Sequence, residues 1–296
     1  MNTPSPRYVV ITPTRDEGRH LQKAIDSMAA QTLRPHQWII VNDGSADKTG
    51  EIIDQAAKEH SWIKAVHRAD RGFRKAGGGV MEAFYDGFAV LGPERWDFMT
   101  KLDGDLSFAP SYFAECLEHF RKDEKLGIGG GTVCSVASGG VEAEARGDPP
   151  FHVRGAVKMY RQPCWQAIGG LRKATGWDTI DELKANMLGW KTYTFPELKL
   201  THYRMAGGAD GAWKNWVKNG RGSYFTGYHP LFMLCKCIAR LRQKPYGVAA
   251  LGLCVGFLSG YLRRIPQVDD RDMIKYLRQQ QVRRLTFRAS LWTQKM

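Results

Sequence analysis

The first 125 residues alternate short runs of β-branched and aromatic residues with stretches whose apolar residues recur at helical spacing. This alternation restricts the chain more than any other feature. It predicts an α/β fold with a mostly parallel sheet and helices on both faces. Strands are expected at residues 8–12, 38–41, 63–67 and 96–102, and helices near 21–33, 47–59 and 79–91. In such sheets ligands bind beyond the carboxyl ends of the strands, so the loops that follow the strands are the first candidates for function.

Beyond residue 125 the pattern is less regular. Glycine-rich or polar loops are expected at 127–131 and 138–150, and a mobile, ligand-facing loop at 206–222. Further strands are predicted at 154–161 and 195–201, with helices at 163–168, 181–188 and 276–285. The chain is therefore expected to divide into a first domain, residues 1–205, and a basic helical C-terminal region, residues 206–296.

The charge of the chain is concentrated near its C-terminus. The chain has 43 Lys and Arg against 30 Asp and Glu, a net charge of +13. Residues 236–296 contain 13 Lys and Arg and 3 Asp, which gives +10 of that total. A basic segment of this kind is typical of proteins that bind nucleic acid or an anionic membrane surface.

The location of the protein is predicted from its cysteines and its N-terminus. The six cysteines form no CxxC pair, which favours free thiols in a reducing compartment. Residues 1–7 contain no apolar segment of the kind that begins a secretory signal. A cytoplasmic protein is expected.

Residues 245–262 form an apolar run without a charged residue, bracketed by Lys244 and Arg263. Its 18 residues are at the lower limit for a membrane-spanning helix. Gly252, Gly256 and Gly260 would lie on one helix face, where they permit close helix packing. A buried helix and a membrane contact both remain open. Basic residues on both sides favour an interfacial or re-entrant helix over a simple span.

Two carboxylates follow the predicted strand at 96–102, in the segment Asp103-Gly104-Asp105. Carboxylate oxygens at a strand end are suited to Mg²⁺ or Mn²⁺, which keeps open positions for phosphate oxygens. The same residues are also common in tight turns.

Three motifs in register give the chain a resemblance to a known family. The segment Val10 to Glu17 resembles the opening strand and loop of the inverting glycosyltransferases of family two, which have the GT-A fold. Ile40 to Ser45 is similar to the family's Val-Asp-Asp-Gly-Ser turn, and Asp103-Gly104-Asp105 lies where the family has its metal-binding Asp-x-Asp. The resemblance is good over residues 8–125 and fair to about 205.

The resemblance implies a nucleotide-sugar site. Asp43 would accept a hydrogen bond from a pyrimidine N3–H, and Arg15, which replaces the usual aromatic residue, would stack on the base. Asn42 replaces the first acid of the family's turn. The donor-binding residues implied are Pro13, Thr14, Arg15, Glu17, Asp43, Arg74, Lys75 and Asp103. The implied metal ligands, for Mg²⁺ or Mn²⁺, are Asp103, Asp105 and His202.

The resemblance also implies a carboxylate base that takes the proton of the acceptor hydroxyl. Counting back from Gly189 in the commonest family spacing selects Asp178, with Trp177 where Glu is usual. A shorter spacing selects Asp181. Either residue could also cap the helix that follows.

The resemblance and the charge pattern together predict an enzyme that moves a sugar, with inversion, from a nucleotide-sugar donor to a glycan or lipid-linked acceptor. It would act at the inner face of the plasma membrane, bound peripherally to an anionic surface, with no nucleic acid as partner. The alternatives are a protein that binds nucleic acid through the basic region and a sugar nucleotidyltransferase. The second would need a Gly-x-Gly-x-Arg loop after the first strand, where this chain has Thr12 to Arg15.

Overall fold

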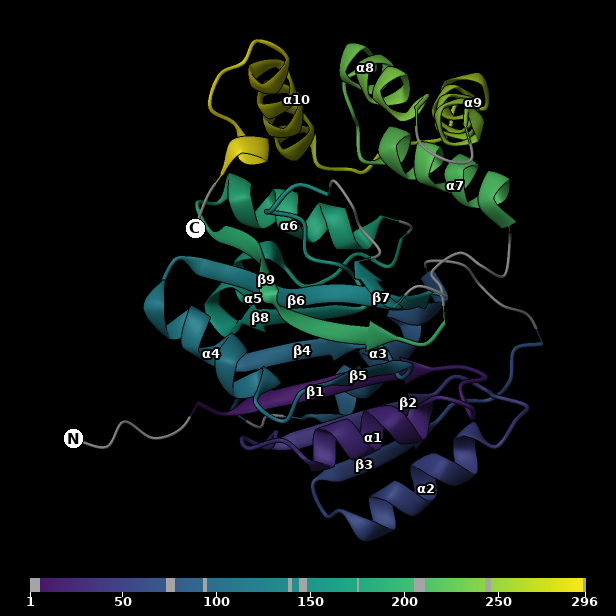
Figure 1. The fold of residues 1–296 in the computed structure, drawn as a ribbon, viewed down its shortest axis with the longest axis vertical. Coiled ribbons are helices and arrows are strands. Elements are labelled where there is room, and N and C mark those ends of the chain that lie inside the picture. The colour runs from purple at the N-terminus through teal and green to yellow at the C-terminus, as the bar shows by residue number, and fades with distance from the viewer. Residues whose placement is uncertain are drawn as a thin grey trace. The chain divides into compact units, whose positions relative to one another are not determined.

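The computed structural model divides the chain into two compact units, Met1–Tyr203 and Arg204–Met296 (Figure 1). The residues that it describes are 6–72, 78–92, 95–137, 140–143, 148–174, 176–204, 211–242 and 246–294. All six cysteines have free thiols.

The first unit is built on a nine-stranded sheet with the order β3-β2-β1-β4-β8-β6-β9-β5, in which β7 pairs with β6. The strands are β1 (Tyr8–Thr14), β2 (Gln37–Asn42), β3 (Ile63–His67), β4 (Phe98–Leu102), β5 (Leu106–Phe108), β6 (Leu126–Ala137), β7 (Gly140–Ala143), β8 (Val157–Arg161) and β9 (Lys191–His202). The described residues of this unit also form the helices α1 (Leu21–Ala29), α2 (Thr49–Glu59), α3 (Gly78–Val90), α4 (Tyr112–Lys122), α5 (Gln162–Ile168) and α6 (Trp177–Met187).

Helices cover both faces of this sheet, in keeping with β1, β2 and β4, which are buried at every position. Val10 and Ile40 pack in a core with residues of α1, α2 and α4. Their neighbours Val9 and Ile39 pack in a second core with residues of α3, α5 and α6. Because successive side chains of a strand point to opposite faces, the two cores lie on opposite sides of the sheet. The predicted α/β class is confirmed.

The sheet is less parallel than predicted. Strands β3, β2, β1 and β4 pair in parallel. Strand β8 then pairs antiparallel with both β4 and β6, and β5 and β7 also pair antiparallel with their neighbours. The parallel half contains the predicted motifs, and the mixed half contains the segments whose sequence pattern was irregular.

The glycine-rich segment 127–131 is a strand, not the predicted loop. It forms the first half of β6. A Cβ atom at Gly129 would lie 2.6 Å from the ring of Phe195, and one at Gly131 would lie 2.2 Å from the carbonyl oxygen of Leu198. Glycine is used here because neighbouring groups approach the backbone closely, not because the chain turns.

The second unit is helical. It contains α7 (Gly211–Phe225), α8 (Pro230–Arg240), α9 (Val248–Leu262), α10 (Arg271–Leu285) and a short 3₁₀ helix, Leu291–Thr293. The predicted loop at 206–222 is therefore wrong from residue 211 onward, while 205–210 lie outside the described residues.

The glycines of this unit serve helix packing. A Cβ atom at Gly256 of α9 would lie 2.1 Å from the carbonyl oxygen of Val217 in α7, and one at Gly252 would lie 2.6 Å from Cβ of Trp216. Gly260 lies as closely against Tyr224. The predicted close packing of the face formed by Gly252, Gly256 and Gly260 is confirmed, and one side of the apolar run is buried.

Apolar side chains of α9 and α8 are also exposed. In α9, Leu251, Val255 and Leu258 are each about half exposed. In α8, Leu231, Leu234 and Ile238 are exposed to a similar degree. In the part of the chain that the structure describes, no helix has both the length and the hydropathy that crossing a bilayer requires.

Candidate active site

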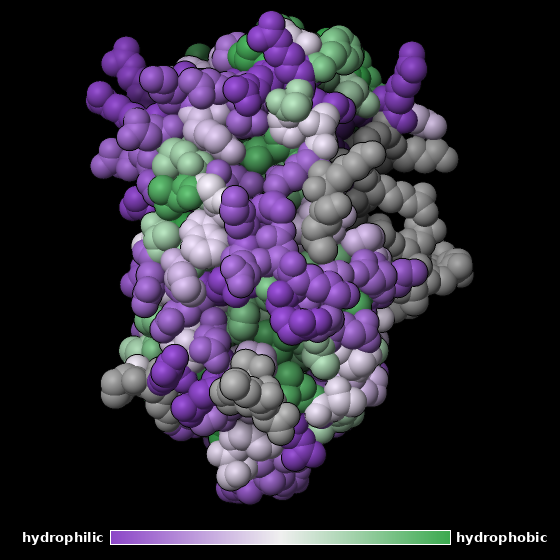
Figure 2. All heavy atoms as spheres, turned by 90° about the vertical axis from the view of Figure 1, so that its left-hand side faces the viewer, coloured by the Kyte–Doolittle hydropathy of each residue, from purple (hydrophilic) through white to green (hydrophobic). Residues whose placement is uncertain are grey.

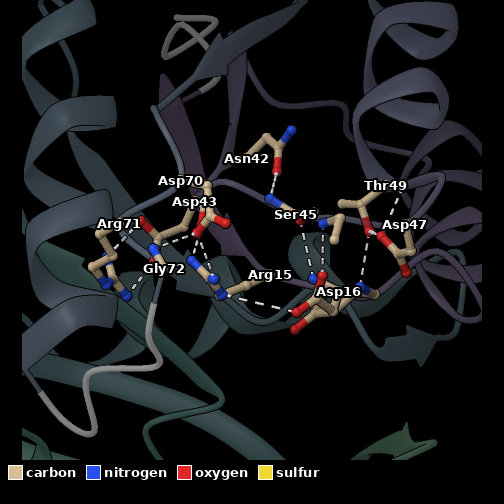
Figure 3. Close-up of polar contacts among 12 residues, drawn as sticks. Arg15, Asp16, Asn42, Asp43, Ser45, Asp47, Thr49, Asp70, Arg71 and Gly72 are labelled. Atoms are coloured by element: carbon tan, nitrogen blue, oxygen red, sulfur yellow. Dashed lines mark hydrogen bonds and ion pairs between the residues drawn. The ribbon is translucent and has the colours of Figure 1, made fainter.

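The loops that follow β1 and β2 are joined by short polar contacts (Figure 3). The backbone N–H of Asp16 donates to Oγ of Ser45 (3.0 Å), and the N–H of Ala46 donates to Oδ1 of Asp16 (2.9 Å). The N–H of Glu17 donates to Oγ1 of Thr49 at 2.8 Å. Because β1 and β2 are parallel neighbours, the two loops lie at one edge of the sheet and form one polar surface.

Three arginines contact Asp43. Arg71 donates to both of its carboxylate oxygens, at 2.8 and 2.7 Å, and Arg68 forms an ion pair with the same carboxylate. Arg15 donates to the backbone carbonyl oxygen of Asp43 at 2.7 Å. A bidentate guanidinium fixes the plane of a carboxylate, so Asp43 has a defined orientation at the sheet edge.

Arg68 is a residue that the sequence analysis did not select. It comes directly after β3, and its N–H donates to the carbonyl oxygen of Asn42. Strand β3 is the parallel neighbour of β2, so its carboxyl end lies beside the loop of Asp43. The position of Arg68 directly after a predicted strand was the signal that could have identified it.

Asn42 forms the turn that allows Asp43 to take this role. Its Oδ1 accepts a hydrogen bond from the N–H of Ser45, three residues on, at 2.9 Å. Gly44 has a φ of 68°, and a Cβ atom there would lie 2.5 Å from Cα of Asp70. The amide of Asn42 therefore caps the turn, and the carboxylate of Asp43 is available for the two arginines.

Arg15 lies between the loops that follow β2 and β3. Besides the carbonyl oxygen of Asp43, its guanidinium donates to Oδ1 of Asp70 at 2.8 Å. This hydrogen bond lowers the pKa of Asp70. The predicted stacking of Arg15 on a base remains a prediction.

Pro13, Thr14 and Glu17 are placed along the end of β1. Pro13 and Thr14 are its last residues, and the Thr14 hydroxyl donates to the carbonyl oxygen of Val41 (3.0 Å). The Glu17 carboxylate lies against the Asp-Gly-Asp turn, because a Cβ atom at Gly104 would be 2.3 Å from its Oε2. Glu17 thus connects the loop after β1 with the loop after β4.

The Asp-Gly-Asp turn places its two carboxylates against different partners. Asp103 forms an ion pair with Lys101. Oδ1 of Asp105 lies 3.3 Å from Nε2 of His202, which is the last residue of β9. Burial raises the pKa of the Asp103 carboxyl, and the neighbouring Asp105 raises it further, although Lys101 opposes this. The carboxylates of Asp103 and Asp105 thus lie close to each other, with Lys101 and His202 as neighbours.

The predicted metal ligands fit a divalent ion in part. Asp105 and His202 lie side by side and supply oxygen and nitrogen, while one oxygen of Asp103 is held by Lys101. Among the residues that the structure describes, no three His, Cys, Asp or Glu side chains are grouped closely enough to hold an ion. Mg²⁺ usually binds through one or two carboxylates together with substrate phosphates, so these residues could hold such an ion together with phosphate oxygens.

The two candidate bases lie in very different surroundings. Asp181 is buried in α6, where it accepts from Nζ of Lys158 (2.9 and 3.0 Å) and the hydroxyl of Tyr160 (2.6 Å). Burial raises the pKa of Asp181 to about 6, against the effect of Lys158. Asp178, in the first turn of α6, is partly exposed and packs against Gly155.

Two of the predicted donor-binding residues, Arg74 and Lys75, lie outside the described residues.

Two solved structures have folds similar to that of this chain. The mannosyltransferase PcManGT from Pyrobaculum calidifontis, in complex with GDP-Man and Mn²⁺, superposes with a TM-score of 0.55 and 16% identity, over 96% of this chain and 76% of that one. S. aureus TarS 1–349 in complex with UDP-GlcNAc gives 0.53 and 13%, over 92% and 79%. The fold is therefore that of the GT-A glycosyltransferases.

The family follows from the sequence. The profile of "Glycosyl transferase family 2" matches residues 9–164, just over half of the chain, and the chain belongs to that family. The uncharacterized glycosyltransferase EpsJ of Bacillus subtilis is 34% identical over 89 residues, 28% of this chain and 26% of that protein. The poly-beta-1,6-N-acetyl-D-glucosamine synthase of Staphylococcus epidermidis is 32% identical over 113 residues, 38% of this chain and 25% of that protein. The matched segments thus span about a quarter of these relatives.

Proposed function

We propose that the protein is a metal-dependent, inverting glycosyltransferase that moves a sugar from a nucleotide-sugar donor to a lipid-linked glycan. The observation that supports this most is the meeting of three strand-end loops, which hold Asp43, Glu17 and the Asp103 turn at one edge of a family 2 fold. Two structures of similar fold were solved with GDP-Man and with UDP-GlcNAc. These are the first donors to test.

The loops after β1, β2 and β3 would bind the nucleoside. Asp43, oriented by Arg68 and Arg71, would accept a hydrogen bond from the base. Arg15 would contact the same part of the donor. Asp105 and His202, with Asp103, would hold Mg²⁺ or Mn²⁺, which supplies positive charge to the donor diphosphate.

Asp178 would act as the base. The oxygen of the acceptor hydroxyl attacks the anomeric carbon and the bond from that carbon to the diphosphate breaks. The nucleoside diphosphate leaves, and the hydroxyl proton passes to Asp178. Attack opposite to the leaving group inverts the configuration. Asp181 is less suited to this step because both of its oxygens are already hydrogen-bonded and the side chain is buried.

The substitution Asp178→Asn tests this assignment. Donor affinity should be nearly unchanged, and turnover should fall by about a hundredfold or more, since general-base help is lost. Turnover is measured as release of nucleoside diphosphate, and affinity by calorimetry. Asp181→Asn is the comparison. It should lower the melting temperature, because a buried hydrogen-bonded carboxylate is lost, but it should reduce turnover less than Asp178→Asn does. If instead only Asp181→Asn abolishes turnover, the base is Asp181.

The same proposal includes a peripheral position at the cytoplasmic face of the membrane. In α8 the exposed residues Leu231, Leu234 and Ile238 recur at spacings of three and four, as on one face of a helix. Leu251, Val255 and Leu258 of α9 follow the same rule. Exposed arginines accompany them in this unit: Arg242, Arg263, Arg264, Arg283, Arg284 and Arg288. Apolar side chains together with nearby positive charge suit the interface of an anionic bilayer.

A further inference from the structure

Two lysines are buried next to each other beneath the candidate active site. Lys101 of β4 and Lys158 of β8 are directly opposite in the antiparallel pairing of these strands. Their exposed fractions are 2% and 0%. Lysine is almost never fully buried without a partner, because its ammonium group must give up its hydration. The hydrogen-bond acceptors around each ammonium group therefore indicate the role of each lysine.

Every acceptor of Lys158 belongs to the start of α6. Its Nζ donates to the carboxylate of Asp181 at 2.9 Å and to the carbonyl oxygen of Asp178 at 2.5 Å, and it lies 2.7 Å from Oε1 of Glu182. An ammonium has three protons, and three groups of one helix take them. Burial alone would lower the pKa of Lys158, but Asp181 and Glu182 raise it, so the side chain stays charged.

Lys158 belongs to a buried cluster that also contains Asp181, Glu182 and His152. The charges of this cluster are balanced. Glu182 accepts from the N–H of Val153 at 2.7 Å and pairs with His152 at 2.9 Å. Lys158 and His152 thus face two carboxyl side chains, Asp181 and Glu182. A balanced, fully hydrogen-bonded cluster of this kind fixes the relative positions of β8 and α6.

Lys101 connects the same helix turn to the Asp-Gly-Asp loop. Its Nζ donates to the carbonyl oxygen of Gly155 at 2.6 Å and forms the ion pair with Asp103. The Nζ atoms of Lys101 and Lys158 each lie 5.6 Å from the ring centroid of Trp177, the first residue of α6. Trp177 therefore lies against both cations, at the junction between the loop of Asp103 and α6.

The side chain of Asp178 lies against Gly155 at this junction. A Cβ atom at Gly155 would lie 3.1 Å from Oδ2 of Asp178 and 3.1 Å from Cζ2 of Trp177. The carboxylate thus rests directly on a glycine whose own carbonyl is held by Lys101. Its backbone is held by Lys158.

We propose that Lys158 is a positioning residue for the transfer step, which holds the first turn of α6 so that Asp178 lies at a fixed distance from the Asp103 turn. The inference rests on the proposed role of Asp178 as base. An apolar side chain could fill the same space without the cost of burying charge. The cation instead provides three directed bonds to the first two turns of α6, at the place where a small displacement of a base reduces the rate most.

The test compares Lys158→Gln with His152→Gln. Both remove a cation from the same cluster, but only the first removes the bond to the carbonyl oxygen of Asp178. The probe is whichever of UDP-GlcNAc and GDP-mannose the wild-type protein hydrolyses. Calorimetry gives the donor affinity and the number of folded binding sites, and product release gives turnover per site. Lys158→Gln should lower turnover per site at least tenfold with donor affinity within about twofold, while His152→Gln should retain turnover.

A double variant keeps the test decisive if Lys158→Gln does not fold. Lys158→Gln with Asp181→Asn removes one cation and one anion together, so no unpaired charge is left in the interior. It should show the same loss of turnover per site. Retained turnover in these variants, when Asp178→Asn is inactive, would overturn the positioning role and leave the proposed function intact. Retained turnover in Asp178→Asn itself would show that the proposed base is wrong.

Discussion

Asn42 and Asp43 are adjacent in the chain but have different functions in the structure. The amide of Asn42 caps its turn, and the carboxylate of Asp43 forms ion pairs with the guanidinium groups of Arg68 and Arg71. The strand and turn could be predicted from the sequence, because β-branched residues and Asn-Asp-Gly-Ser act locally. The contact of Arg68 with Asp43 could not, because it depends on the pairing of β2 with β3, although the position of Arg68 directly after a predicted strand marked it as a candidate. The same holds for Lys158, which the sequence shows only as one polar residue in a predicted strand.

His152 should make the stability of the protein depend on pH. Burial alone would lower the pKa of His152, but the Glu182 carboxylate raises it to about 9, above the ordinary 6.5. A raised pKa means that the stabilisation is complete below about pH 6.5 and is lost as the pH rises through 9. The wild-type protein should therefore lose on the order of 3 kcal/mol of unfolding free energy over this range, at most.

Urea unfolding of the wild type and His152→Gln at several pH values between 6.5 and 9 gives the comparison. The difference between the two proteins should shrink as the pH rises, because the variant lacks the titrating group. Other groups titrate equally in both proteins and cancel in the difference. A difference that stays constant, or grows with pH, would mean that the pair of His152 and Glu182 does not stabilise the charged imidazole.

Among the helices and strands, the regular α/β half was the predictable part. Strand β3 was predicted to the residue, and β1, β2, α2 and α3 to within about two residues. The errors at β6 and α7 share a cause, since both segments are rich in glycine and glycine predicts loops when only neighbours in sequence are considered. In the structure Gly129, Gly130 and Gly131 of β6 and Gly220 of α7 lie where another backbone or ring approaches too closely for a side chain. That information resides in contacts between distant segments.

Gly220 and Gly222 of α7 provide a matched test of this explanation. A Cβ atom at Gly220 would lie 2.3 Å from the carbonyl oxygen of Leu253, whereas at Gly222 nothing lies within 4 Å. Gly222→Ala should stabilise the unit by about 0.5–1 kcal/mol through helix propensity. Gly220→Ala should destabilise it by about 1–3 kcal/mol, because α7 and α9 must separate. Thermal unfolding followed by circular dichroism measures both, and equal effects would show that α7 and α9 do not pack closely.

For the molecule as a whole, the distribution of charge and apolar surface matters more than any single contact. The surface in Figure 2 is mainly hydrophilic, with hydrophobic patches, some of them at the top of the view, where the C-terminal helices lie. Of the net charge of +13, residues 236–296 contribute +10. Composition locates the basic region, but only the structure shows that the apolar run has one buried and one exposed side.

Flotation with liposomes tests the proposed membrane surface. The full-length protein should float with anionic liposomes at low salt and much less at high salt, because each Lys or Arg contributes about 1 kcal/mol and salt screens it. Leu234→Glu with Ile238→Glu should reduce the salt-resistant part of the binding. Leu188→Glu, an exposed leucine of the first unit, is the control and should float as the wild type does. Tight, salt-sensitive binding to RNA with no flotation would favour a nucleic-acid partner instead.

The central claim is that the sheet edge binds a nucleotide sugar together with a divalent ion. Calorimetry with uridine, guanosine and thymidine diphosphate sugars, in Mn²⁺ and in excess EDTA, tests it most directly, with Asp105→Ala measured in parallel. At least one donor should bind the wild type in Mn²⁺ and bind about tenfold or more weakly in EDTA, and Asp105→Ala should behave in Mn²⁺ as the wild type does in EDTA. Absence of binding and of hydrolysis for every donor in Mn²⁺ would contradict the proposed function, and equal affinity in EDTA would remove the metal from it.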